Sequence, residues 1–287
     1  MRPPPASPPL SLPPLALPAF EPGWVWLAGA GPGDPGLLTL HVVNALAQAD
    51  VVVHDALVGP EILGFARTGA VLEYAGKRGH KTSIKQSEIC ARLVQLARRG
   101  KRVLRLKGGD PLVFGRGGEE ALALVGAGVP FRILPGISAG VGGLAYAGIP
   151  VTHRTTNSAV TFITGHDARG QLPRDLDWQA LAKGAPVLVV YMGLRHLPEI
   201  VERLLAGGRN PAEPLAVVSD ASLPTQAVLE TTLGRAAADV AAAGLAAPAL
   251  IVIGEVVRLR GAMDWVGALS GRILVAEPEA GAAVLQG

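Results

Sequence analysis

The chain of 287 residues has a single cysteine, few aromatic residues and little charge, and each shortage excludes a class of protein. Because Cys90 has no second cysteine to pair with, neither an intramolecular disulfide nor a thiolate metal cluster can form, and nothing requires an oxidising compartment. Aromatic residues make up 4% of the chain and the formal net charge is only +3, so a nucleic-acid-binding protein is not indicated. The six histidines form no H-x-x-x-H or H-E-x-x-H pair, and we expect no metal site.

Proline and glycine interrupt both stretches that could pass for a targeting or membrane segment. Residues 1–22 hold nine of the 24 prolines, which predicts an extended, flexible leader outside the fold rather than a signal peptide. Residues 133–152 carry no charge over twenty positions, but seven of them are glycine or proline. Such a segment would leave backbone groups without partners in lipid, so it predicts a buried turn and a short core helix. We therefore expect no membrane partner and a cytoplasmic protein.

Hydrophobic residues make up 49% of the chain, and they occur in short apolar runs that alternate with helical periodicity. The runs predict strands at residues 24–27, 51–53, 71–74, 103–106, 131–134, 160–163, 187–191, 215–218, 227–231 and 250–253. The clearest helix is predicted over residues 83–99, with Gly100 closing its end. This alternation favours an α/β fold with largely parallel sheets, and only the strand at 227–231 is predicted to be antiparallel.

The length predicts two domains with one strand series each. We expect a proline-rich leader over residues 1–22, an N-terminal α/β domain over 23–147, a C-terminal α/β domain over 148–265 and a tail over 266–287. Ligands of open α/β sheets bind beyond the carboxyl ends of the strands, so the loops at those ends are the first candidates for a functional site.

Two glycine-rich loops follow predicted strands. The first, G-A-G-P-G-D-P-G at 29–36, fails the dinucleotide motif G-x-G-x-x-G because Asp34 stands where the last glycine belongs, and its carboxylate would repel a pyrophosphate. The second, L-K-G-G-D-P-L-V-F-G-R-G-G-E-E at 106–120, holds five glycines but no P-loop pattern, which disfavours a nucleoside triphosphate. Glycines gathered in this way predict a ligand that approaches the backbone closely.

The segment G-I-S-A-G at 136–140 matches the G-x-S-x-G elbow of serine hydrolases. A hydrolase with Ser138 as the nucleophile therefore stays open, with Asp167 or Asp175 and then His196 following in the expected order. Against it, Pro135 restricts the strained turn that the elbow needs, and the chain lacks an HGGG-type oxyanion element. In the other interpretation, Ser138 begins a helix or contacts a ligand.

Basic residues gather between positions 71 and 107, where eleven Lys or Arg side chains accompany two acidic ones. Lys77, Arg78 and Lys81 follow a predicted strand, and such a loop can form an electropositive mouth for a polyanionic substrate. Ordinary solvated surface charge explains the pattern equally well. Asp55 closes the run V-V-V-H-D, where a carboxylate is either a turn cap or a site residue.

Six linked motifs span residues 24–265 and carry a resemblance to a known family. They are G-A-G-P-G-D-P-G-L-L-T at 29–39, V-V-V-H-D-A-L-V at 51–58, A-G-K-R-G-H-K at 75–81, L-K-G-G-D-P-L-V-F-G-R-G-G-E-E at 106–120, P-G-I-S-A-G at 135–140 and G-I-P-V-T-H-R at 148–154. Together they resemble the tetrapyrrole methylase superfamily, and within it the uroporphyrinogen-III C-methyltransferase family in its single-function, cobalamin-pathway form. The resemblance implies a homodimer of two-domain α/β subunits with the active site in the cleft between the domains.

The resemblance also implies an activity, a cofactor and a set of site residues. The activity is S-adenosylmethionine-dependent methylation of uroporphyrinogen III, twice, through precorrin-1 to precorrin-2, with another precorrin methyltransferase as the alternative. Asp55 matches the family's proposed base and Lys77 its proposed proton donor, while Arg78 and Lys81 are expected to contact substrate. The implied cofactor contacts are Pro32, Gly108, Gly109, Asp110, Val113, Ser138, Ala139, Met192, Ala221 and Ala249. No metal is implied. Ala221 departs from the glycine that relatives often have.

Overall fold

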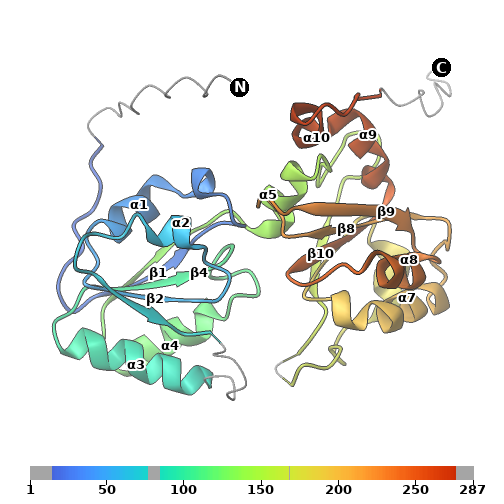
Figure 1. Ribbon diagram of the computed structural model, residues 1–287. Helices are drawn as coiled ribbons and strands as arrows, with labels where there is room; N and C mark the ends of the chain where they lie inside the picture. Colours follow the sequence, from blue (N-terminus) through green and yellow to red (C-terminus); the bar gives the residue numbers. More distant parts are fainter. Residues whose placement is uncertain (1–14, 77–84, 168, 276–287) are drawn as a thin grey trace, which may run out of the picture.

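Two α/β lobes lie side by side in the computed structural model, and one short helix lies between them (Figure 1). The structure describes residues 15–76, 85–167 and 169–275. Within these ranges, no helix has both the length and the apolar character needed to cross a membrane.

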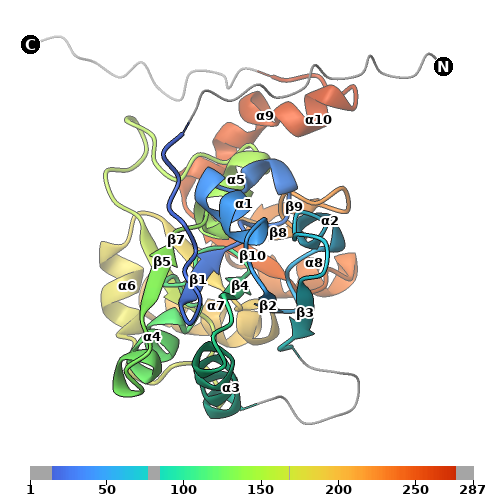
Figure 2. The same cartoon turned by 90° about the vertical axis from the view of Figure 1, so that its left-hand side faces the viewer.

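The first lobe is built on a five-stranded parallel sheet of order β3-β2-β4-β1-β5. Its strands are β1 (Val25–Gly29), β2 (Val51–His54), β3 (Val71–Tyr74), β4 (Val103–Lys107) and β5 (Phe131–Leu134). Every residue of β1, β2 and β4 is buried, because helices cover both faces of a parallel sheet. Helices α1 (Leu40–Leu46) and α2 (Pro60–Leu63) cover one face, and α3 (Gln86–Arg98) and α4 (Gly117–Gly126) cover the other (Figure 2).

The second lobe is built on a mixed sheet of order β6-β7-β10-β8-β9. Its strands are β6 (Thr161–Thr164), β7 (Leu188–Tyr191), β8 (Pro214–Ser219), β9 (Ala227–Thr232) and β10 (Ala249–Ile253). One face packs against α6 (Trp178–Gly184), α7 (Leu197–Ala206) and α8 (Ala236–Ala243). The other face packs against α5 (Ala139–Tyr146), the helix between the lobes, and the 3₁₀ helix at Glu255–Leu259. Two short helices, α9 (Arg260–Met263) and α10 (Trp265–Leu269), follow.

The expected α/β class is confirmed, and each predicted strand is present with its ends shifted by no more than two residues. Strand β9 pairs antiparallel with β8, as predicted. The expectation that the other strands would be parallel is wrong for β10, which is antiparallel to both β7 and β8. The reason is geometric: α8 carries the chain back to the edge where β9 began, so β10 runs in the same direction as β9. For the helix predicted over 83–99, the described part begins at Gln86, and Gly100 follows its end with φ +72°.

The residues just before β1 pack onto the first lobe. Phe20 is 2% exposed, and its ring stacks on Trp26 with the ring centroids 4.1 Å apart. The Phe20 N–H donates to Gln48 Oε1 over 3.0 Å, and the Pro18 carbonyl accepts a bond from Asn44 over 3.0 Å. The last part of the segment expected to be a flexible leader is thus part of the packed lobe.

Replacing Phe20 with Ala is expected to lower the free energy of unfolding by about 3 kcal/mol, because it removes a buried ring and leaves a cavity beside Trp26. Leu15→Ala is the matched control: Leu15 is 43% exposed, and its loss should change stability by less than about 0.5 kcal/mol. Urea denaturation followed by tryptophan fluorescence measures both variants. Equal effects of the two substitutions would show that this segment does not pack on the lobe in solution.

Candidate active site

The loops that follow β1, β4 and β5 meet at the carboxyl edge of the first sheet, where glycines let the backbones touch. Gly31 and Gly109 exchange two backbone hydrogen bonds, of 3.1 and 2.7 Å. A Cβ atom added to Gly29 would lie 2.6 Å from the Gly136 Cα atom, and one added to Gly136 would lie 2.6 Å from the Gly29 Cα atom. No side chain fits at either position, so the two glycines are required by close approach.

A carboxylate and a fourth loop complete this edge. Asp110 accepts the Leu112 N–H at Oδ1 over 2.8 Å and the Gly136 N–H at Oδ2 over 3.0 Å, so it ties the β4 loop to the β5 loop. A Cβ atom on Gly108 would lie 2.9 Å from the Leu57 Cβ atom, which puts the loop after β2 against the start of the β4 loop. Four strand ends thus converge on one backbone-lined surface.

The second lobe reaches this surface through Tyr191, the last residue of β7. Its hydroxyl lies 2.6 Å from Ser138 Oγ and accepts the Gly140 N–H over 2.8 Å. Burial raises the pKa of Tyr191, which therefore stays a neutral phenol. Tyr191 is not among the site residues predicted from the sequence. The available signal was a tyrosine at the end of a buried strand, because a buried hydroxyl needs a polar partner.

Most of the predicted cofactor contacts lie around this meeting of the two lobes. Val113, Ala139 and Ala221 pack against the same apolar cluster as Tyr191, and Met192 follows Tyr191 with φ +55° and 42% of its surface exposed. Pro32 lies against α5, since a Cβ atom on Gly142 would be 3.5 Å from the Pro32 Cγ atom. The assignment of these residues to a cofactor stays a prediction.

Ala249 differs from the other predicted contacts. Its side chain packs into the cluster of α6, α7 and α8, on the face of the second sheet opposite Ala139 and Ala221. Side chains alternate between the two faces of a strand, so Ala249 and its neighbour Leu250 point to opposite faces, and Leu250 is the one on the face of Ala139 and Ala221. Only its backbone is available to the face that Ala221 occupies.

Asp55 stands at the exposed end of a buried cluster of four charges. Arg105 Nη2 donates to Asp55 Oδ1 over 2.5 Å, and Lys107 Nζ lies 3.6 Å from Asp55 Oδ2. Behind them, Glu120 accepts Arg105 Nε over 3.0 Å and Lys107 Nζ over 3.1 Å. The side chains of Glu120, Arg105 and Lys107 are 0, 2 and 4% exposed, while that of Asp55 is 30% exposed. Two cations balance two carboxylates, and only Asp55 is open to a substrate.

The pKa of Arg105 shows that the carboxylates of this cluster keep the buried guanidinium charged. Burial lowers the pKa of its guanidinium, but the Asp55 and Glu120 carboxylates outweigh burial and hold the pKa above its ordinary value. Asp55 therefore always faces a cation. Arg105 and Lys107 belong to the basic stretch noted in the sequence, where nothing predicted this role for them. The available signal was the sequence of the strand itself, in which Arg105 and Lys107 are separated by one residue in an otherwise apolar run. Two such charges point to the same face of the strand, and charges on a buried strand need partners.

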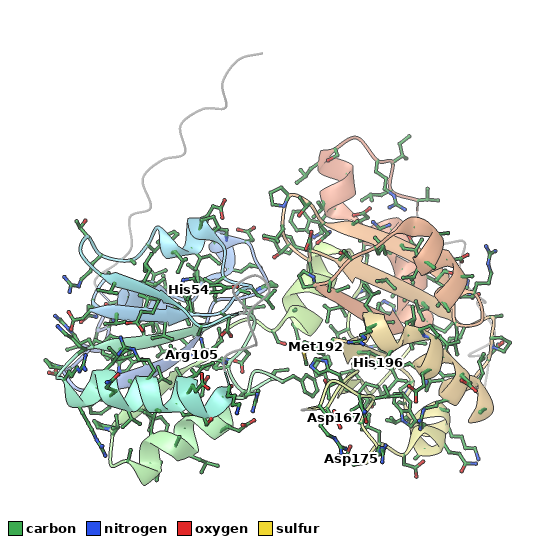
Figure 3. The ribbon with its side chains drawn as sticks, turned by 60° about the horizontal axis from the view of Figure 1, so that its bottom comes forward. His54, Arg105, Asp167, Asp175, Met192 and His196 are labelled. Carbon is green, nitrogen blue, oxygen red and sulfur yellow. The ribbon has the colours of Figure 1, made fainter. Side chains whose placement is uncertain are left out.

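Figure 3 labels His54 and Arg105 in the first lobe. His54 Nδ1 lies 3.2 Å from the Asp55 carbonyl, and its ring meets Tyr74 edge-on with centroids 5.6 Å apart. The predicted proton donor Lys77 and the predicted substrate contacts Arg78 and Lys81 lie outside the described residues.

The hydrolase alternative is wrong on this geometry. A catalytic serine needs a base within hydrogen-bond reach, but Ser138 bonds Tyr191, and His196 Nε2 donates to the Gly170 carbonyl over 3.0 Å. Asp167 accepts the backbone N–H groups of its own loop, and it lies with Asp175, His196 and Met192 in the second lobe (Figure 3). Across the described ranges, no hydrogen bond joins Ser138 to His196.

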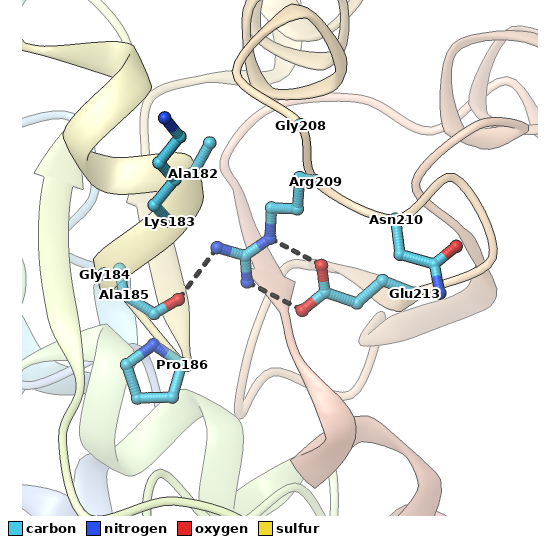
Figure 4. Close-up of a pocket in the computed structure, with 9 residues that line it drawn as sticks. All are labelled: Ala182, Lys183, Gly184, Ala185, Pro186, Gly208, Arg209, Asn210 and Glu213. Carbon is cyan, nitrogen blue, oxygen red and sulfur yellow. Dashed lines mark hydrogen bonds and ion pairs between the residues drawn. The ribbon is translucent and has the colours of Figure 1, made fainter.

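A cavity of about 370 Å³ lies at the opposite edge of the second sheet, before β7 and β8 begin (Figure 4). Arg209 crosses it and donates to Glu213 from Nε over 2.5 Å and from Nη2 over 2.7 Å. The remaining terminal nitrogen, Nη1, donates to the Ala185 carbonyl over 2.8 Å. Each guanidinium nitrogen thus already donates to protein, and Arg209 joins the segment before β7 to the loop before β8.

Replacing Glu120 with Gln is expected to lower the free energy of unfolding by about 3–5 kcal/mol, because it leaves two buried cations with only one carboxylate. Its neighbour provides the control: Glu119 is 55% exposed and pairs with Arg116 at the surface, so Glu119→Gln should cost less than about 1 kcal/mol. Denaturant titration at neutral pH compares them. If Glu120→Gln proved as stable as Glu119→Gln, the buried cluster would not be balanced as described.

Comparison with known proteins places this geometry in a family. Residues 25–237 match the family described as Tetrapyrrole (Corrin/Porphyrin) Methylases. A uroporphyrinogen-III C-methyltransferase of Sinorhizobium sp is 67% identical over 260 residues, which cover 91% of this chain and 93% of the relative. A siroheme synthase of Methylococcus capsulatus is 49% identical over 247 residues, covering 85% of this chain but 52% of the synthase, so the chain spans about half the length of that relative.

A solved structure agrees with these relatives. The uroporphyrin-III C-methyl transferase of Thermus thermophilus, crystallised with S-adenyl homocysteine, superposes with a TM-score of 0.70. It is 39% identical, and the match covers 82% of this chain and 99% of the other. The chain therefore belongs to the tetrapyrrole (corrin/porphyrin) methylase family.

Proposed function

We propose that the chain is an S-adenosylmethionine-dependent C-methyltransferase that methylates uroporphyrinogen III twice, through precorrin-1, to precorrin-2 in cobalamin or siroheme biosynthesis. The observation that carries the proposal is the 67% identity to the Sinorhizobium uroporphyrinogen-III C-methyltransferase across 91% of the chain. The backbone-lined edge between the two lobes supports it.

The residues at this edge fit S-adenosylmethionine. Gly108 and Gly109 place no side chain over this surface, and Gly109 has φ +66°, a conformation that favours glycine. The Asp110 oxygens each accept one N–H and keep a lone pair for a ligand hydroxyl. Val113, Ala139, Met192 and Ala221 offer an apolar wall. When bound, S-adenosylmethionine supplies a methyl group on a positively charged sulfur, already electrophilic, so the main task of the chain is positioning.

Asp55 is the group suited to manage the proton that leaves the substrate. Its carboxylate reaches the surface at the carboxyl edge of the first sheet, and its N–H donates over 3.2 Å to the Leu106 carbonyl, two residues before Gly108. Arg105 and Lys107 hold it in one orientation from below. In the proposal, Asp55 accepts the pyrrole proton after methyl transfer, Lys77 donates a proton, and Arg78 and Lys81 bind substrate carboxylates through charge-assisted hydrogen bonds.

The proposal also covers the oligomeric state, the cellular location and the domain bounds of the protein. Leu122 and Val125 are 73 and 61% exposed on one face of α4, and exposed apolar side chains of this kind support a homodimer. The single cysteine supports a cytoplasmic location, because the protein needs no oxidising compartment. The division into a domain over residues 23–147 and one over 148–265 also remains a proposal.

Incubation with methyl-labelled S-adenosylmethionine and uroporphyrinogen III is expected to yield a product with two added methyl groups, measured by mass spectrometry. Heat-inactivated protein is the control. Absence of transfer would overturn the proposal, and transfer to a more highly methylated precorrin alone would favour the alternative member of the same family.

Replacing Asp55 with Asn is expected to lower turnover by about 10²–10⁴-fold, the usual contribution of a general base, while binding of S-adenosylhomocysteine stays near normal. Asp50→Asn is the matched control, because Asp50 precedes the same strand at its other end and pairs with Arg67 and Arg102. Steady-state rates and calorimetric binding measure the two effects. Wild-type turnover in Asp55→Asn would remove Asp55 from the mechanism.

A further inference from the structure

Four residues form a closed ring of hydrogen bonds where the two lobes meet. Tyr146 Oη donates to Asp34 Oδ2 over 2.6 Å, and the Asp34 N–H donates to Ser222 Oγ over 3.0 Å. The Ser222 N–H donates to Gln226 Oε1 over 2.8 Å, and Gln226 Nε2 donates to the Tyr146 carbonyl over 3.1 Å. We call Asp34, Tyr146, Gln226 and Ser222 the hydrogen-bond ring.

The ring joins three segments that are far apart in the chain. Asp34 belongs to the loop after β1, Tyr146 is the last residue of α5, and Ser222 and Gln226 lie between β8 and β9. The first and third segments also touch at Gly33, where an added Cβ atom would lie 2.8 Å from Leu223 Cδ2. The ring therefore fixes the glycine-rich loop of the first lobe against the second lobe.

Each of the three segments carries a predicted cofactor contact. Pro32 precedes Asp34 by two residues, Ala221 directly precedes Ser222, and Ala139 begins the helix that Tyr146 ends. Ala221 is seated against this helix as well, since a Cβ atom on Gly143 would lie 2.7 Å from the Ala221 Cβ atom. A change in the ring thus moves contacts on both sides of the site.

The backbone around the ring is held in an uncommon conformation. Ser222 has φ +66° and Asp220 has φ +49°, both in the left-handed region that residues other than glycine rarely adopt. Ser222 is nevertheless 8% exposed and uses both its N–H and its hydroxyl in the ring. Such strain persists only where the surrounding contacts enforce it.

Tyr146 keeps the ring closed over a wide pH range. The bond to the Asp34 carboxylate, together with burial, raises the pKa of Tyr146 to about 12. Its hydroxyl therefore remains a donor at any pH at which the enzyme would work. The Asp34 carboxylate, which disfavours a dinucleotide in this loop, faces Tyr146 and the Gly36 N–H.

We propose that the hydrogen-bond ring sets the geometry of the S-adenosylmethionine site, with Tyr146 and Ser222 as positioning residues that act through the loops of Pro32 and Ala221. This inference rests on the proposed function. It predicts that loss of a ring bond weakens cofactor binding without slowing the chemical step of the bound complex.

The test replaces Tyr146 with Phe and Ser222 with Ala and measures S-adenosylhomocysteine by calorimetry. Tyr146→Phe removes a hydrogen bond to a charged group, so we expect the Kd to rise about 10-fold. The KM for S-adenosylmethionine should rise similarly with kcat unchanged. In the double variant, the combined effect should differ from the product of the single effects, because both bonds converge on Asp34.

Thr225→Val is the matched control. It removes a hydroxyl-to-carboxylate bond, from Thr225 Oγ1 to Asp220 Oδ2 over 3.0 Å, in the same loop but outside the ring. We expect it to bind S-adenosylhomocysteine like the wild type. A purely structural role of the ring would instead reduce the folded fraction, lowering the maximal rate while leaving KM unchanged.

The outcomes separate this inference from the proposed function. Wild-type affinity and KM in both Tyr146→Phe and Ser222→Ala would overturn the inference, and so would an equal loss in Thr225→Val. If the wild-type protein itself failed to bind S-adenosylhomocysteine, the proposed function would fall and the inference with it.

Discussion

The close approach of three backbones at Gly29, Gly109 and Gly136 is the constraint on which the rest of the site depends. Only where side chains are absent can the loops after β1, β4 and β5 touch, and only then can one carboxylate, Asp110, accept N–H groups from two of them. The result is a surface made of backbone at the carboxyl edge of a parallel sheet, where α/β proteins bind ligands. The site is thus determined by positions that carry no functional group.

Charged residues make up 17% of this chain, and the buried ones discussed here form ion pairs. Glu120 and Asp55 together balance Arg105 and Lys107 beneath the sheet edge, and Asp55 is the one member of that cluster open to solvent. Arg209 pairs with Glu213 at the far edge of the other sheet, where each of its three guanidinium nitrogens donates to protein. The first cluster ends in a half-exposed carboxylate at the carboxyl edge of its sheet, whereas the Arg209 guanidinium is held between Glu213 and the Ala185 carbonyl.

Local pattern was enough to predict the strands, because short apolar runs between breakers leave few alternatives in a chain of this composition. It was not enough for the direction of β10, which depends on where α8 returns the chain. Nor could it reveal partners that only the fold brings together, such as Tyr191 with Ser138, or Tyr146 with Asp34 across 112 positions. The alternation of side chains along β10 turns Ala249 away from Ala221, but it could be used only once the two faces of the sheet were known.

The most direct measurement of the central claim is a crystal structure of this protein with S-adenosylhomocysteine. We expect the ligand to lie against Gly108 to Asp110, with Ala139 and Ala221 on its other side. Binding elsewhere, for example in the cavity that Arg209 crosses, would contradict the claim that the glycine-lined edge between the two lobes is the methyl-transfer site.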